Sequence, residues 1–129
     1  MNRLEIEHLL HDLYAARVRG DIDAVCQSFS DDARFEIAGT SHATPVAVTA
    51  AGAGEFRPLL RLMVKSFMLE EQKTLSMIID GQKAAVHWRA RVHSRITGSA
   101  VPTELVDIIE IGESGRITHY TEFFIGRYL

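Results

Sequence analysis

DIIEIGESGRITHYTEFF, residues 107–124, has the clearest structural pattern in the sequence. The residue pattern has a period of two on both sides of the segment from Gly112 to Gly115, which predicts two strands joined by a tight reversal. A reversal centred on this segment places Asp107 directly opposite Glu122 on the neighbouring strand. The final hairpin therefore brings two carboxylates to one face of a sheet.

Upstream of this hairpin the period of two continues, and it predicts four strands in all. The predicted strands are residues 72–79, 83–96, 103–111 and 116–125. Asp80-Gly81 favours a tight turn between the first two strands, and Gly98 marks the next reversal. Four strands joined by such short reversals pair in sequence as an antiparallel meander.

The N-terminal half has helical spacing instead, because apolar residues recur every three or four positions in three segments. These predicted helices are residues 4–19, 22–29 and 55–69. Gly20 ends the first helix, and Asp21 is a suitable N-cap for the second. Between the second and third helices we expect one short strand, 33–38, and one long loop, 39–54. Helices followed by strands predict an α+β fold.

The composition is that of one globular domain spanning residues 1–129, since 47% of the 129 residues are hydrophobic. The net charge of −3 is not gathered into long runs of one sign, so we expect neither nucleic acid nor a membrane as a partner. Cys26 is the single cysteine and cannot form an internal disulfide. No segment has the apolar core of a secretory signal or of a membrane span, so we expect a cytoplasmic protein.

The predicted strands differ in the character of their two faces. In strand 83–96, Trp88 and the residues in phase with it are apolar, whereas His87, Arg89 and the residues in phase with them are basic. The basic stripe suits either an anion-binding surface or an outer face that is solvated or covered by another subunit. The final hairpin is apolar on both faces, which requires helices on one side and a second subunit on the other. We therefore expect a homodimer through the outer sheet face.

Asp107 and Glu122 carry the chemistry that we expect. Residues directly opposite each other have Cβ atoms about 5 Å apart, and two carboxyl groups so close in an enclosed site do not both ionise readily. Desolvation and a neighbouring negative charge both raise a carboxyl pKa, which leaves one group able to donate a proton near neutral pH. Two alternatives stay open: either acid could point outward, or Glu122 could pair with an arginine such as Arg17.

Five further residues are candidates for binding a substrate. Tyr14 lies on the buried side of the first helix, and His42 lies in the long loop where a lid would be. The other candidates are on the predicted strands: Trp88, Tyr120 and Phe124. The sequence has no zinc-binding spacing, no glycine-rich phosphate loop and no Gly-x-Ser-x-Gly elbow, so we expect no metal and no cofactor.

Residues 13–36 contain a helix, a Gly-Asp break, a second helix and a Phe-x-Asp-Asp-Ala entry to a strand, and residues 107–124 form the closing hairpin. Both segments resemble the nuclear transport factor two-like superfamily, which contains ketosteroid isomerases, SnoaL-type polyketide cyclases and limonene epoxide hydrolases. The resemblance implies a cone-shaped α+β barrel. In such a fold three N-terminal helices pack on a curved mixed or antiparallel sheet around an apolar pocket.

The resemblance also implies roles by position. Asp107 matches the protonated aspartic acid that helps to form the oxyanion hole of ketosteroid isomerases, and Glu122 matches a catalytic aspartate of the epoxide hydrolases. The general base of the isomerases falls on Ile37, and their oxyanion tyrosine falls on Leu13, one residue before Tyr14. The SnoaL-type cyclases, which use an aspartate as acid and base in the same pocket, describe the chain best.

These observations lead to one hypothesis and one rival. The hypothesis is a cofactor-independent enzyme that transfers a proton on a small apolar molecule, by isomerisation, cyclisation, dehydration or epoxide opening, with Asp107 and Glu122 as a coupled acid–base pair. The rival is a non-catalytic domain of the same fold that binds a ligand or recruits a protein partner, because a fold alone does not determine a function.

Overall fold

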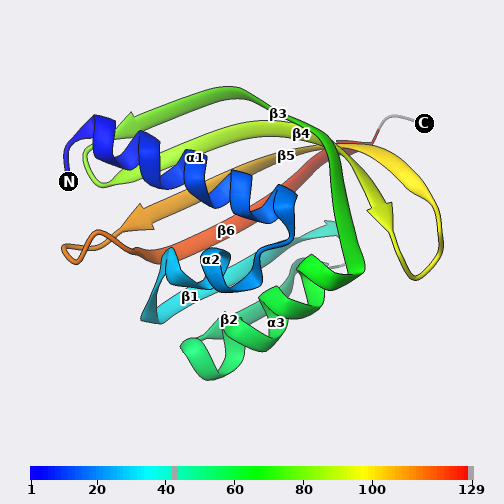
Figure 1. The fold of residues 1–129 in the computed structure, drawn as a ribbon, viewed down its shortest axis with the longest axis horizontal. Helices are drawn as coiled ribbons and strands as arrows, with labels where there is room; N and C mark the ends of the chain where they lie inside the picture. The colour runs from blue at the N-terminus through cyan, green and yellow to red at the C-terminus, as the bar shows by residue number, and fades with distance from the viewer. Residues whose placement is uncertain (42–43, 128–129) are drawn as a thin grey trace.

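The computed structural model describes residues 1–41 and 44–127, which form three helices and six strands (Figure 1). The helices are α1 (Arg3–Arg19), α2 (Ile22–Gln27) and α3 (Ala53–Ser66). The strands are β1 (Phe29–Ser41), β2 (Thr44–Ala51), β3 (Phe67–Asp80), β4 (Lys83–Ser94), β5 (Ala100–Ile111) and β6 (Ile117–Arg127). All six strands belong to one sheet, in the order β2-β1-β6-β5-β4-β3.

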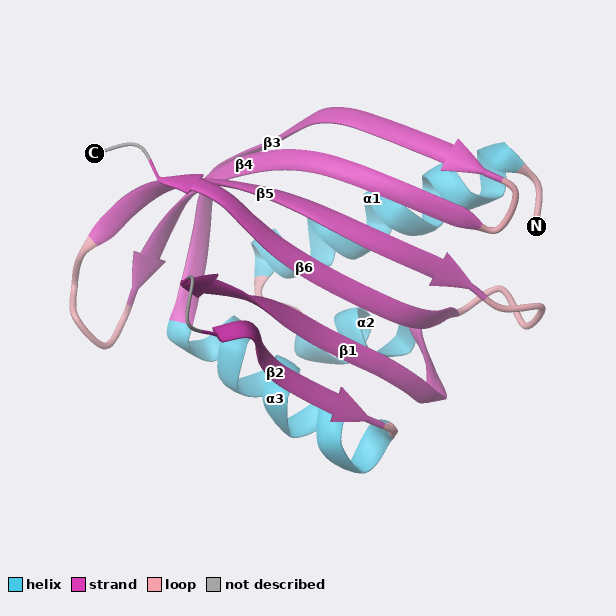
Figure 2. Ribbon diagram, turned by 180° about the vertical axis from the view of Figure 1, so that it is seen from behind, coloured by secondary structure: helices cyan, strands magenta, loops and turns pink. Residues whose placement is uncertain are grey.

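The helices lie on one face of the strongly curved sheet, and the opposite face carries none of the described helices (Figure 1 and Figure 2). The strands from β3 to β6 form the predicted antiparallel meander, and β6 then pairs with β1 in parallel, so the sheet is mixed. The sheet curves around the helices without closing, because β2 and β3 remain as its two edges. The predicted α+β class, with three helices on a curved sheet, is confirmed.

The first helix begins and ends at residues that suit those positions. The Asn2 side chain accepts from the amide of Glu5, and the Glu5 side chain accepts from the amide of Asn2, which completes a capping box. Gly20 ends the helix at a φ of 74°, a left-handed conformation that favours glycine. Asp21 caps α2 by accepting from the amide of Ala24, as the sequence predicts.

The predicted loop at residues 39–54 is wrong, because β1 continues to Ser41 and β2 occupies Thr44–Ala51. The segment is rich in Gly, Ala, Thr and Pro, which favoured a loop. Its antiparallel pairing with β1 outweighs that local preference. Pro45 is tolerated in β2 because this strand lies at the edge of the sheet, where a missing backbone donor matters least.

Two helix ends also differ from the prediction. β1 begins at Phe29, inside the predicted second helix, because this residue already pairs with β6. α3 ends at Ser66, short of the predicted end at Leu69, because Phe67 already pairs with β4. In both places a long-range strand pairing extends a strand into residues whose apolar spacing favoured a helix.

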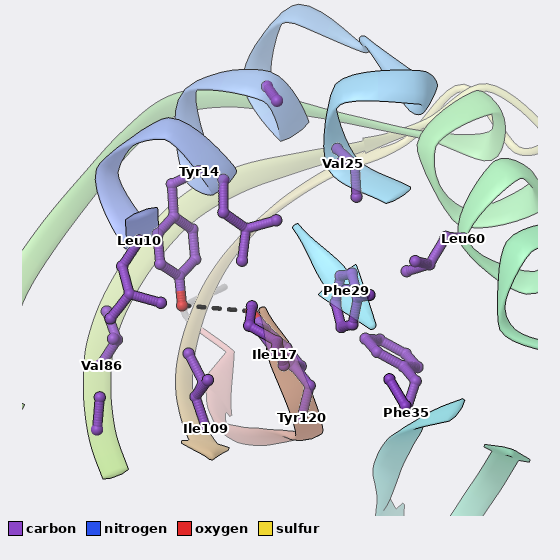
Figure 3. Close-up of a cluster of buried hydrophobic side chains, with 14 of the residues drawn as sticks. Leu10, Tyr14, Val25, Phe29, Phe35, Leu60, Val86, Ile109, Ile117 and Tyr120 are labelled. Atoms are coloured by element: carbon purple, nitrogen blue, oxygen red, sulfur yellow. Dashed lines mark hydrogen bonds between the residues drawn. The ribbon is translucent and has the colours of Figure 1, made fainter. Parts of the chain in front are cut away.

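The core fills the space between the helices and the inner face of the sheet. The Phe29 ring lies 6.2 Å from that of Phe35, 5.5 Å from that of Phe56 and 5.7 Å from that of Tyr120, measured between centroids. Figure 3 shows three of these rings together, below Val25 of α2. The aromatic cluster therefore ties α3 and β1 to β6, the strand that carries Glu122.

The outer face of the sheet is part basic and part apolar. The predicted basic stripe of β4 lies here, and acidic neighbours balance part of it: His87 contacts Glu104, and His93 contacts Glu70. Large apolar side chains are also exposed on this face, among them Ile78 (65%), Ile108 (43%), Phe123 (38%) and Ile125 (53%).

Candidate functional site

The two acids of the final hairpin lie opposite each other on the inner face of the sheet. Asp107 of β5 pairs with Glu122 of β6, as the sequence predicts. Asp107 is fully buried, and Glu122 is only 1% exposed. Burying two charged carboxylates side by side is unfavourable unless neighbouring groups compensate the charge. The contacts of each acid therefore decide what the site can do.

Asp107 receives three hydrogen bonds, all on the same oxygen. Its Oδ2 accepts from the Tyr14 hydroxyl at 2.5 Å, from Trp88 Nε1 at 2.8 Å and from the Tyr120 hydroxyl. The two tyrosine hydroxyls lie 3.3 Å apart, and Figure 3 shows the Tyr14 ring pointing from α1 toward the sheet. The second oxygen, Oδ1, has no hydrogen-bond partner among the residues that the structure describes.

Arg17 pairs with Glu122 through two contacts. Nη1 donates to Oε2 at 2.7 Å, and Nη2 donates to Oε1 at 3.4 Å. Nη1 also donates to the Tyr120 hydroxyl at 3.2 Å and lies 3.9 Å from Asp107 Oδ2. The Trp88 ring lies 5.1 Å from Arg17 Cζ, within the range of a cation–π contact. One guanidinium therefore serves both carboxylates.

The first helix supplies two members of this cluster from a single face. Tyr14 and Arg17 stand at positions i and i+3, so their side chains lie side by side on the helix. Leu10 and Leu13 are buried on the same side and hold α1 against the sheet. Helix packing thus sets the position of both the phenol and the guanidinium.

Asp107, Glu122, Arg17, Tyr14 and Tyr120 form one buried cluster. It contains two acids but one arginine, and the pKa of Asp107 reflects this imbalance of charge. Burial, followed by the negative charge of Glu122, raises the pKa of Asp107 well above its ordinary value. Arg17 and the hydrogen bonds from the two tyrosines act in the opposite direction without outweighing burial. Asp107 therefore keeps its proton to a higher pH than an ordinary aspartate. With Asp107 neutral, the Arg17–Glu122 pair leaves the cluster without net charge.

The other members of the cluster remain hydrogen-bond donors at neutral pH. Burial and the nearby Asp107 raise the pKa of Tyr14 and the pKa of Tyr120 well above the ordinary value. Burial acts to lower the pKa of Arg17, but Glu122 and the other neighbours raise it overall. The two phenols and the guanidinium therefore all keep their protons.

A cavity of about 500 Å³ lies between the helices and the inner face of the sheet. The Arg17–Glu122 pair lies in its wall, together with Trp88 and Phe124. Most of the other lining residues are aliphatic or aromatic and come from α2, α3, four of the strands and the turn between β4 and β5. The arrangement is an apolar chamber with one ion pair in its wall, which is the usual composition of a small-molecule site.

The structure separates the predicted site residues into two groups. Those that line the cavity are Glu122, Trp88 and Phe124. Those that form a hydrogen-bonded layer behind it are Tyr14, Asp107 and Tyr120. Arg17 and Trp88 contact this layer and line the cavity in its place. His42 lies outside the described residues.

Arg17 is a cavity residue that the sequence prediction missed. The sequence suggests it only as a partner that could engage Glu122, and the structure confirms that this contact forms. The available signal was its spacing from Tyr14 on the buried side of the first helix. That spacing indicates which side of α1 carries Arg17, but not how far its side chain reaches.

Within residues 1–41 and 44–127, no group of three or more His, Cys, Asp and Glu side chains is arranged to hold a metal ion. The described helices include none that is long and apolar enough to cross a membrane.

Comparison with known proteins extends the resemblance over most of the chain. The SnoaL-like domain model matches residues 10–120. The structure is similar to a proposed isomerase from Bacillus subtilis, with a TM-score of 0.80, 18% identity and 97% of this chain and 90% of that chain covered. It is similar to an NTF2-like protein from Burkholderia xenovorans LB400, with a TM-score of 0.73, 20% identity and coverage of 97% and 92%.

A third similar structure is an LEH-like epoxide hydrolase from M. tuberculosis, with a TM-score of 0.75, 21% identity and 95% of this chain and 84% of that chain covered. No curated protein matches the sequence. At these identities the likeness to the solved structures is one of fold.

Breaking the buried ion pair provides a test of the site. Arg17→Met should lower the free energy of unfolding by about 3–5 kcal/mol, because Glu122 keeps a buried charge without its partner. Combining Arg17→Met with Glu122→Gln removes both charges and should recover most of that loss. Urea denaturation followed by circular dichroism measures both effects. If the losses caused by Arg17→Met alone and by Glu122→Gln alone simply add in the double variant, the two side chains do not act as a pair.

Proposed function

The chain belongs to the SnoaL-like domain family, within the nuclear transport factor two-like superfamily, and we propose that it is a cofactor-independent enzyme that transfers protons on a small, largely apolar molecule. The position of Glu122 supports this proposal most directly. Its carboxylate lies in the wall of an apolar cavity and is held there by Arg17. A base in such a wall can take a proton from a ligand that apolar contacts bind.

In the proposed reaction, Glu122 is the catalytic base. It accepts a proton from a carbon beside a carbonyl group, or from an attacking water, and the proton is later returned to another atom. Arg17 lies beside it and donates to the oxygen on which negative charge develops. Asp107 acts through Tyr120 and Arg17 rather than on the substrate, so it is a positioning residue whose proton keeps the cluster neutral.

Two of the similar proteins are consistent with this reaction class. One is a proposed isomerase, and another is an epoxide hydrolase. Isomerisation moves a proton between atoms of one substrate, while epoxide opening removes a proton from water and delivers one to the epoxide oxygen. Both need a base beside a group that stabilises a developing oxyanion, and Glu122 and Arg17 are our candidates for these roles.

A non-catalytic ligand-binding domain is the second candidate. It is favoured by the Arg17–Glu122 contact itself, because both oxygens of Glu122 already accept hydrogen bonds. In that case the pair recognises a polar group of the ligand without taking its proton. Turnover therefore separates the two candidates, whereas binding does not.

Glu122→Gln should slow proton transfer about 10²- to 10⁴-fold, because glutamine keeps the shape of the side chain but does not act as the base. Suitable uncharged probes are 2-decanone, whose α-hydrogens exchange for deuterium in D2O, and 1,2-epoxydecane, which hydrolyses to a diol. NMR follows the first reaction and gas chromatography the second. Ligand binding is followed separately by the fluorescence of Trp88, the single tryptophan of the sequence and a cavity residue.

The matched control is Glu36→Gln, since Glu36 contacts His119 on the outer face of the sheet and should not affect turnover. Thermal melting verifies that each variant is folded. Wild-type protein that binds these probes without exchanging or hydrolysing either would contradict the enzyme and support the binding domain.

We further propose that two copies associate through the outer face of the sheet. Strand pairing joins Ile78 to Ile108 through Ala85, and sets Phe123 opposite Val106, so the exposed apolar residues of this face are contiguous. No described helix covers them (Figure 2). A twofold axis would set this patch of one copy against the same patch of the other and cover its apolar side chains, which suits a homodimer.

Ile108→Lys should shift the protein from dimer to monomer, because it places a charge in the centre of the proposed interface. Sedimentation velocity at micromolar concentration measures the change. Leu62→Lys is the control, since Leu62 is 62% exposed on α3 and lies away from this face. A wild-type protein that sediments as a monomer at all concentrations contradicts the proposed dimer.

A further inference from the structure

The cavity has polar groups at two ends and apolar walls between them. One end holds the Arg17–Glu122 pair, and the other is the turn at residues 94–99 between β4 and β5, whose serine and threonine side chains belong to the lining. Thr103 lies between the ends, but its hydroxyl already donates to the carbonyl of Val101. The middle of the cavity therefore offers a ligand little besides apolar contact.

The strand register shows the direction in which this cavity extends. Glu122 lies opposite Asp107, and the lining then follows β5 toward the turn. The lining residues along this path are Leu105, Thr103, Val101 and Ser99. These four positions span about 20 Å of strand, at about 3.3 Å per residue. The lining is therefore elongated along β5, from the ion pair to the turn.

The turn is the open end of the cavity. Ile96 is 77% exposed and Phe67 is 43% exposed, and both belong to the lining. Glu122, at 1% exposed, marks the closed end. The amide of Arg95 donates to the carbonyl of Ser66, which holds the turn against the end of α3. A ligand that enters past this turn therefore reaches the ion pair last.

The closed end favours an uncharged polar group. A ligand carboxylate at this end would be repelled by Glu122, whose charge Arg17 already balances. A ligand ammonium group would be repelled by Arg17. A hydrocarbon end removes water from the ion pair without replacing its hydrogen bonds. A carbonyl or epoxide oxygen can accept from Arg17, and a hydroxyl group can in addition donate to Glu122.

We propose, building on the function proposed above, that the ligand is an elongated and uncharged molecule with an apolar body and one oxygen function at the end that enters first. The oxygen function lies against Arg17 and Glu122. The apolar body extends past Trp88 and Leu105 toward the turn between β4 and β5. This assigns a substrate class to the site by length and charge.

Binding of straight-chain 2-ketones with six to twelve carbons, measured by Trp88 fluorescence and calorimetry, tests this inference. Affinity should rise about fourfold with each added methylene group. Decanoate and decylammonium should bind at least about tenfold more weakly than 2-decanone, because a charged group has no unpaired partner at the closed end. An affinity that does not change with chain length, or a charged probe that binds as tightly as the ketone, overturns the inference.

A variant inside the cavity tests the direction of binding. Thr103→Phe fills the cavity partway along β5, so it should weaken 2-dodecanone at least about tenfold while 2-hexanone, held at the closed end, is nearly unaffected. Leu62→Phe, on the exposed side of α3 and outside the cavity lining, is the matched control and should change neither affinity. Equal losses for both ketones in folded Thr103→Phe contradict the placement of the oxygen at the closed end. If Thr103→Phe does not fold, the wild-type series still decides the ligand class.

These measurements are independent of turnover. A protein that shows the predicted binding trends but exchanges no deuterium keeps this ligand class and loses the proposed enzyme activity. A protein that turns over the probes without these trends keeps the activity and loses the ligand class.

Discussion

One guanidinium between two buried carboxylates is the interaction on which the rest of the site depends. Arg17 contacts Glu122 with both terminal nitrogens and lies 3.9 Å from Asp107. Since burial and the charge of Glu122 oppose ionisation of the second acid, Asp107 is the group that keeps a proton. The wall of the cavity thus presents an ion pair without excess charge. Glu122 is the acid in the cavity wall, whereas Asp107, behind it, is the acid that holds the proton.

The fold produces this arrangement through one central strand and one helix. β6 lies between β5 and β1, which sets Glu122 between Asp107 and Ile37 on the inner face. α1 packs over the same face and brings Arg17 to Glu122. Behind the cavity, Tyr14 and Tyr120 donate hydrogen bonds to Asp107 Oδ2 without adding charge. Arg17 and Glu122 lie in the cavity wall, where they are available to a ligand.

The parts that could be predicted from the sequence depend on local patterns. The period of two around the final reversal predicts the register of Asp107 and Glu122, and the helical spacing before Gly20 predicts the buried side of α1. The parallel pairing of β1 with β6 could not be predicted, because it joins segments far apart in the chain. β2 was missed because its pairing with β1 outweighs its loop-like composition, and the role of Arg17 was missed because a helical pattern does not report where a long side chain ends.

The charge state of the cluster can be measured by an NMR titration of the Asp107 carboxyl carbon, with Asp107→Asn to assign the resonance. We predict that this carboxyl stays protonated well above the ordinary value of about 3.9, because burial and Glu122 disfavour its ionised form. In the unfolded chain the Asp107 carboxyl loses its proton at a lower pH than in the folded chain. The free energy of unfolding of the wild type, relative to that of Asp107→Asn, should therefore fall as the pH rises from the unfolded to the folded pKa of this carboxyl. If Asp107 instead titrates near its ordinary value, both acids are charged and the buried cluster is not neutral.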